Sequence, residues 1–262
     1  MSAIFPTTLL SYLNILSIFL RLLGFFMLVP GFSHRTIPPM VKLLLALVVA
    51  LALYPLLASR LEALPLESLS GIVAIALRET VLGFLMGFVA YLTFEAIHLA
   101  AQFIGFQMGF GAAGLVDPVN HSQVSVLVPL TGWVALMVFF LTDMHHNLLV
   151  LFVRSFEITH SIELSSFSTV SVAKLLIQKT GELFVVAVKI AAPYTFLVLA
   201  TNAAVGILSR LLPQMQMLLF VFPVTIFLGI CGLYLLAPDL IDYFQGVMDQ
   251  MGQDVILLLR TI

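Results

Sequence analysis

Charged side chains are scarce along this chain. Asp, Glu, Lys and Arg make up 9% of its 262 residues and hydrophobic residues make up 61%, whereas soluble domains carry roughly 25% charged residues. So few charges cannot cover a water-exposed surface. The composition excludes an ordinary soluble domain and indicates that a membrane solvates most of the chain.

A surplus of positive charge is also missing. The chain has 11 basic and 13 acidic residues, and its formal net charge is −2. Proteins that bind nucleic acid neutralise phosphates with a basic surface. No such surface is available here, so we expect no nucleic acid among the partners.

Cysteine is nearly absent as well. The single residue, Cys231, lies in an apolar run, which excludes an intramolecular disulfide and a Cys-x-x-Cys metal or redox site. The first thirty residues contain no basic region before the apolar stretch and no obvious cleavage site, so we predict a retained first span rather than a removed signal peptide.

Long apolar runs are what the chain does contain. A helix crosses a hydrocarbon core about 30 Å thick with roughly 20 apolar residues, and helices satisfy their own backbone hydrogen bonds inside lipid. We therefore predict an all-α membrane protein with about six long apolar helices. The expected spans are Thr7–Pro30, Pro39–Ala58, Ile72–Ile104, Val126–Val153, Thr180–Leu208 and Met217–Ala237, and Thr169–Leu208 is also readable as one long helix.

Polar residues within these apolar stretches are candidate functional residues. A charge at bilayer depth costs at least ~2.5 kcal/mol unless it faces protein or water. These residues are therefore either structural ties between helices or groups that line a wet conduit or a seam between subunits. The candidate ties are Arg21, Arg78, Glu79, Glu95, Lys189, Asn202 and Arg210, and Asn14 and His98 are further polar residues of this kind.

Small residues recur at a spacing that lets helix backbones approach closely. Gly83-xxx-Gly87 lies within the third predicted span and Gly105-xxx-Gly109 lies at its end. Such spacing is typical of tight helix contacts in membranes. We expect dense helix packing at both places.

The segment Gly105–His121 combines several glycines with bulky apolar side chains. Glycine permits backbone conformations that other residues avoid, and methionine adapts to irregular surroundings. The segment is therefore either a compliant plug that closes a lumen by excluding water or an ordinary turn. The candidate gate residues are Phe106, Met108, Phe110, Leu115, Val116 and Asp117.

No pattern in the chain indicates enzyme chemistry. Gly109-x-Gly111-x-x-Gly114 follows a long apolar helix and lacks the later acidic residue of a dinucleotide site. The pairs Glu95/His98 and Glu157/His160 resemble half-motifs of di-iron bundles, which require both pairs at one depth, but only the first pair lies mid-span. The cluster of Asp143, His145 and His146 lacks further ligands at metal-site spacing. No serine-hydrolase motif is present. We therefore predict no catalytic, cofactor or metal residues.

The stretch after Pro238 has the pattern of an amphipathic acidic helix. It either docks on a partner or is a solvated terminal helix. Its acidic residues are Asp239, Asp242, Asp249 and Asp254.

Several segments, taken together and in order, resemble the FliR family, the export-gate subunit of flagellar and related type III secretion systems. They span nearly the whole chain. They are Phe19–Gly24 with Pro30, Arg35–Pro38 with Lys42, Glu79 with Gly83 and Gly87, Gly105–Gly109 through Asp117-Pro118, and Lys189 with Pro193, Asn202, Gly206, Arg210, Pro213-Gln214 and Phe222-Pro223.

The resemblance implies a single export-gate domain over residues 1–262 in the bacterial inner membrane. It implies a FliP-like part over about 1–165 with a gate loop at 105–122, followed by a FliQ-like helical hairpin and acidic tail over about 166–262. Partners would be FliP-like, FliQ-like and FlhB-like subunits, membrane lipid and unfolded secretion substrates in transit. The alternatives to a gating subunit are a small-solute secondary transporter and a membrane metalloenzyme.

Overall fold

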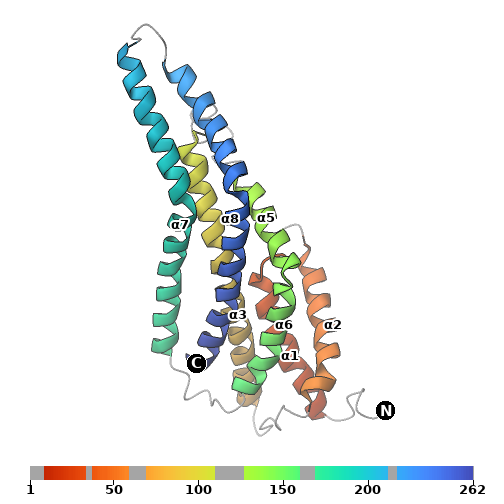
Figure 1. The fold of residues 1–262 in the computed structure, drawn as a ribbon. Coiled ribbons are helices and arrows are strands. Elements are labelled where there is room, and N and C mark those ends of the chain that lie inside the picture. Colours follow the sequence, from red (N-terminus) through yellow and green to blue (C-terminus); the bar gives the residue numbers. More distant parts are fainter. Residues whose placement is uncertain are drawn as a thin grey trace, which may run out of the picture. The chain divides into compact units, whose positions relative to one another are not determined.

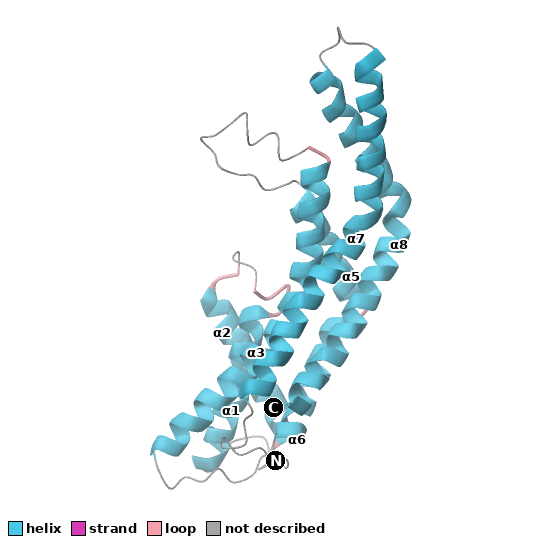
Figure 2. Ribbon diagram, turned by 90° about the vertical axis from the view of Figure 1, so that its left-hand side faces the viewer, coloured by secondary structure: helices cyan, strands magenta, loops and turns pink. Residues whose placement is uncertain are grey.

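The computed structural model describes residues 9–33, 37–58, 69–109, 127–159, 169–211 and 217–261. Figures 1 and 2 show that every regular element in these ranges is an α-helix. The helices are α1 (Leu9–Leu28), α2 (Pro39–Leu57), α3 (Leu69–Gln107), α5 (Leu127–Leu141), α6 (Met144–Thr159), α7 (Thr169–Leu211) and α8 (Met217–Thr261). The predicted all-α fold class is confirmed.

Five of the helices, α1, α2, α3, α7 and α8, are long and apolar enough to cross a membrane. The pair α5 and α6 forms a sixth span if the two count as one broken span. The prediction of about six long apolar helices is therefore confirmed. The region from Thr169 is one helix of 43 residues, the longer of the two readings of the sequence.

The predicted span Val126–Val153 is not one helix, because the chain turns at Thr142 and Asp143. Asp143 has a φ of 55°, a left-handed conformation that Asp tolerates better than most residues. The Asp143 carbonyl accepts hydrogen bonds from the amides of His146 and Asn147, at 2.9 and 3.1 Å, which starts α6. The polar run at 142–147 therefore marks a helix boundary.

The predicted end of the last span at Ala237 is wrong, because α8 continues through Pro238 for 45 residues in all. A proline removes one backbone hydrogen bond and usually ends or kinks a helix. Apolar membrane helices tolerate proline where neighbouring groups satisfy the freed backbone. Pro223 in α8 and Pro193 in α7 lie inside helices in the same way.

Within the described part of the chain, the residues group into two compact units. Unit 1 comprises Met1–Leu92, Asp143–Lys179 and Met248–Ile262, and unit 2 comprises Thr93–Thr142 and Thr180–Val247. In unit 1, α2 packs on α1, and the ring centroids of Phe25 and Phe152 are 5.7 Å apart. In unit 2, the rings of Phe94 and Phe139 meet edge to face at 5.6 Å.

The last turns of α8 pack inside unit 1. One face of this segment is buried, and the side chain of Asp254 pairs with Lys179 of α7 at an oxygen–nitrogen distance of 2.8 Å. Asp249 and Arg260 lie on the exposed side. The amphipathic pattern thus serves packing within the chain rather than a free, fully solvated helix, and the buried residues are Met248, Met251, Val255, Leu258 and Leu259.

Candidate functional site

A buried polar cluster in unit 1 joins α1, α3 and α6. The Nε and Nη2 atoms of Arg21 both lie 2.5 Å from Oε2 of Glu79. Nη1 donates to Ser155 Oγ at 2.8 Å, and Nη2 donates to Thr159 Oγ1 at 3.1 Å. The guanidinium carbon also lies 3.8 Å from the centre of the Phe156 ring. Arg21 therefore has ionic, hydroxyl and aromatic partners on two other helices.

The geometry of α6 explains why its hydroxyls can accept these bonds. Ser155 donates its own proton to the Phe152 carbonyl at 2.6 Å, and Thr159 donates to the Ser155 carbonyl at 2.7 Å. Both oxygens therefore present lone pairs to Arg21. Because all four polar side chains of the cluster are buried, their mutual satisfaction is what makes the charge tolerable at this depth.

Glu79 has a second arginine partner on its own helix. Nε and Nη2 of Arg78 lie 3.2 and 3.0 Å from Glu79 Oε1, the carboxylate oxygen that faces away from Arg21. Arg78 is partly exposed, with 21% of its side chain accessible. The buried guanidinium of Arg21 and the partly exposed guanidinium of Arg78 thus share one carboxylate, and the structure brings together the predicted ties Arg21, Arg78 and Glu79.

The crossing of α1 and α3 depends on glycine. A Cβ at Gly83 would overlap the backbone of Arg21, and a Cβ at Gly87 would lie 2.7 Å from the Phe25 carbonyl oxygen. Gly24 approaches the backbone of α3 in the same way. The predicted close packing at Gly83-xxx-Gly87 is confirmed. The other pair differs, because Gly109 lies in the turn after α3 with a φ of 90°.

Glu95 and His98 form a partly exposed pair in unit 2. His98 Nδ1 lies 3.5 Å from Glu95 Oε1, with about a third of each side chain accessible. The imidazole lies over Gly132 of α5, where a Cβ would come within 2.8 Å of His98 Nε2. The predicted tie Glu95 therefore has a partner one turn along its own helix, and α5 covers that partner.

The remaining predicted ties, Lys189, Asn202 and Arg210, are exposed on α7. The same helix surface carries large apolar side chains in the open, among them Phe196 and Leu199. Charged and amide groups beside exposed apolar residues on a membrane helix require partners from lipid headgroups, water or other chains. The structure does not bring these three residues into the buried cluster.

The end of α3 holds the first of the candidate gate residues. Phe106 is 77% exposed, whereas Met108 is fully buried. Gln107 Nε2 donates to Thr195 Oγ1 of α7 at 2.9 Å, and Thr225 Oγ1 of α8 donates to the Met108 carbonyl at 3.2 Å. Within this chain Met108 is a core side chain rather than a projecting one. Phe110, Leu115, Val116 and Asp117 lie outside the described residues.

Several residues that take part in these contacts were not among the residues predicted from the sequence, namely Ser155, Thr159, Thr195 and Thr225. A hydroxyl in an apolar helix is an ambiguous signal, because it commonly bonds to its own helix backbone. Ser155 and Thr159 are four positions apart and therefore share a helix face, which is the one cue that could have paired them with a charged residue. The others are recognisable only once the helices are packed.

Metal ligands do not converge in the described ranges. No group of three or more His, Cys, Asp or Glu side chains there is arranged to hold a metal ion. Asp143 and His146 are exposed at the turn between α5 and α6. Glu157 is exposed on α6, and His160 lies outside the described residues.

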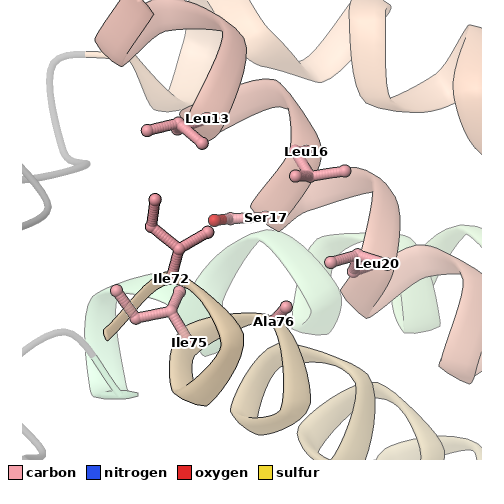
Figure 3. A pocket seen from close by; sticks show the side chains of 7 residues that line it. All are labelled: Leu13, Leu16, Ser17, Leu20, Ile72, Ile75 and Ala76. Carbon is pink, nitrogen blue, oxygen red and sulfur yellow. The ribbon is translucent and has the colours of Figure 1, made fainter. Parts of the chain in front are cut away.

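Figure 3 shows the side chains of α1 and α3 that line a pocket between these two helices. Its wall contains one hydroxyl, that of Ser17, and is otherwise aliphatic. Such a wall suits an acyl chain or an apolar side chain and offers nothing to orient a polar solute. The lining residues are Leu13, Leu16, Ser17 and Leu20 of α1 and Ile72, Ile75 and Ala76 of α3.

Long apolar helices tied by a buried ion pair and by glycine crossings define a multi-pass helical membrane protein. The family model described as "Bacterial export proteins, family 1" matches residues 12–251. The chain therefore belongs to this family, the FliR family, which is a non-enzymatic component of bacterial export machinery.

Curated relatives cover most of the chain. It is 30% identical to the flagellar biosynthetic protein FliR of Escherichia coli K12 over 88% of this chain and 87% of that protein. It is 31% identical to FliR of Pectobacterium carotovorum over 89% and 87% of the two chains. It is 27% identical to FliR of Bacillus subtilis 168 over 80% and 81%. As a FliR homologue, the chain is a multi-pass membrane component of the flagellar or type III export apparatus.

Proposed function

We propose that this chain forms part of the wall of the export channel and that its segment 106–121 is a plug that closes the channel. The family membership supports a place in the export apparatus. The exposed ring of Phe106 at the end of α3 is the observation that carries the plug. It is a large apolar side chain at the start of a glycine-rich apolar segment, and the described residues leave it 77% exposed.

The exposed apolar faces of α7 and α8 support a role as wall. Phe196 on α7 and Tyr234, Leu235 and Phe227 on α8 are all strongly exposed, Tyr234 at 81%. Apolar patches this large mark contacts with lipid or with other proteins. Because Lys189, Asn202 and Arg210 share α7, we assign part of this surface to FliP-like, FliQ-like and FlhB-like subunits and the rest to lipid.

The proposed mechanism is steric and hydrophobic. Bulky apolar side chains in a narrow lumen exclude water and ions, because dewetting makes the passage of a hydrated ion unfavourable. An unfolded substrate displaces these side chains because it brings apolar groups of its own. Glycines at positions 109, 111 and 114 give the segment the backbone freedom that displacement requires.

The test is permeability of cells that carry the assembled complex. Substituting Ala for Phe106, Phe110, Leu115 and Val116 together is expected to let small solutes and ions leak inward while the complex still assembles. The matched control is Leu77→Ala, which shortens an exposed apolar side chain elsewhere on α3. Co-purification with the neighbouring subunits verifies assembly. If cells that carry the variant with all four alanine substitutions show no increase in permeability, the plug is refuted.

A further inference from the structure

We propose that Thr195, Thr225 and Gly229 are positioning residues that hold the end of α3 in place, and we call these three residues the clamp. The end of α3 is then a fixed base from which the gate segment starts. The proposal rests on the plug function stated above, and it adds which residues fix the position of the plug. All the residues involved belong to unit 2 and are described by the structure.

The first contact of the clamp holds the Gln107 side chain. Its Nε2 donates to Thr195 Oγ1 at 2.9 Å, and Thr195 donates onward to the Ala191 carbonyl at 3.0 Å. The threonine therefore accepts from α3 while its own proton stays on α7. A residue in the last turn of α3 is thus bonded to a neighbouring helix rather than to solvent.

The second contact holds the backbone of Met108. A helix leaves its last carbonyls without intrahelical partners, and Thr225 Oγ1 supplies one to the Met108 carbonyl at 3.2 Å. The hydroxyl has one proton, which it shares between the Met108 carbonyl and the Val221 carbonyl of its own helix, 3.0 Å away. Thr225 is buried, so removal of its hydroxyl would leave the Met108 carbonyl without this donor in an apolar setting.

The third contact holds the Met108 side chain. It is fully buried against Gly229 of α8, where an added Cβ would lie 2.7 Å from Met108 Cγ and 2.6 Å from Sδ. A larger residue at position 229 would force the thioether of Met108 to move from this position. The clamp therefore ends at Met108, and the next residue, Gly109, has a φ of 90° that takes the chain out of the helix.

The clamp predicts a leak when it is weakened. Thr225→Val keeps the shape of the side chain and removes the donor, and the loss of one hydrogen bond is expected to raise small-solute leakage about two- to tenfold at an unchanged amount of assembled complex. The control is Thr201→Val, since the Thr201 hydroxyl bonds to the Leu197 carbonyl on its own helix. An equal leak from both variants, or from neither, would overturn the clamp.

A substitution at Gly229 tests the Met108 contact. Gly229→Ala is expected to leak in the same direction as Thr225→Val, because its Cβ would overlap the Met108 side chain. Gly181→Ala is the control, because a Cβ at Gly181 has nothing within 4 Å. A tight membrane with Gly229→Ala, or an equal leak from Gly181→Ala, would contradict the contact.

A disulfide tests whether the base is fixed. In a chain with Cys231→Ala, the test pair is Met108→Cys with Gly229→Cys. A Cβ at Gly229 would lie 2.7 Å from Met108 Cγ, which is one bond from the Met108 Cβ, and bridged Cβ atoms lie roughly 3.5–4.5 Å apart. We expect the bond to form on mild oxidation in the assembled complex, with export retained. Failure to form, or a block of export that reduction relieves, would overturn the fixed base.

The outcomes separate the two proposals. Leaky plug variants combined with tight Thr225→Val and Gly229→Ala variants refute the clamp and leave the plug intact. If the plug variants do not leak, while the disulfide forms and export is retained, the plug is refuted. The disulfide would still show that the end of α3 is fixed.

Discussion

Removal of the Glu79 carboxylate is expected to destabilise unit 1 strongly. Glu79→Ala would leave Arg21 charged and buried, and its partners among the described residues would be the Ser155 and Thr159 hydroxyls and the Phe156 ring. Breaking a buried ion pair from one side costs about 3–5 kcal/mol. That corresponds to a loss of roughly 10²- to 5 × 10³-fold in the folding equilibrium.

The structure also predicts how this loss is reversed. Replacing both charges, with Arg21→Met and Glu79→Leu, removes the unpaired buried charge, and apolar pairs of similar volume are often neutral or stabilising in place of an ion pair. Arg78 is partly exposed, so its guanidinium is not a second fully buried charge in that variant. We therefore expect the double variant to be more stable than Glu79→Ala alone.

The assay is thermal unfolding of the export complex purified in mild detergent, together with the amount of chain retained in membranes. Arg154→Ala is the control, since Arg154 is exposed on α6 and surface changes usually stay within about 0.5 kcal/mol. The reasoning fails if Glu79→Ala unfolds like Arg154→Ala, or if the double variant is less stable than Glu79→Ala.

Two further predictions concern packing. Gly83→Ala should destabilise the complex strongly, because its Cβ would meet the backbone of Arg21. Gly181→Ala should be neutral or stabilise the complex by up to about 1 kcal/mol through helix propensity. Equal melting temperatures of the two variants would contradict the close approach of α1 and α3 at Gly83. Met251→Asp should unfold the end of α8 because it buries a charge, whereas Asp249→Asn on the exposed side should not. Limited proteolysis near the C-terminus distinguishes the Met251→Asp variant from the Asp249→Asn variant. Equal cleavage of the two variants would refute the packing of the last turns of α8 inside unit 1.

The helices themselves could be predicted from the sequence, because hydropathy over about 20 residues is a local property and the backbone must satisfy itself in lipid. The same holds for the close packing at Gly83 and Gly87, since small residues four apart share a face. The helix boundaries are harder to predict from the sequence. Pro238 looked like an end because proline usually breaks a helix, yet α8 runs through it.

The partners of the polar residues could not be predicted in this way. Arg21 and Glu79 stood out as costly charges, but nothing local links Arg21 to Ser155, which lies 134 positions away. Likewise, Lys189 and Glu95 looked alike in the sequence, and one is exposed on α7 while the other pairs with His98. Which helix faces meet is decided by packing, and packing decides which charge is satisfied within the chain.

The sequence alone therefore determined that this is a multi-pass helical protein, that it carries charges requiring partners, and that a glycine-rich apolar segment follows α3. The tertiary structure decided that Met108 is held in the core while Phe106 projects from it, and that the terminal helix packs on its own chain. The physical reason is the separation of the interacting residues along the sequence. Membrane partition and helix formation depend on neighbours along the chain, whereas burial depends on residues that only folding brings together.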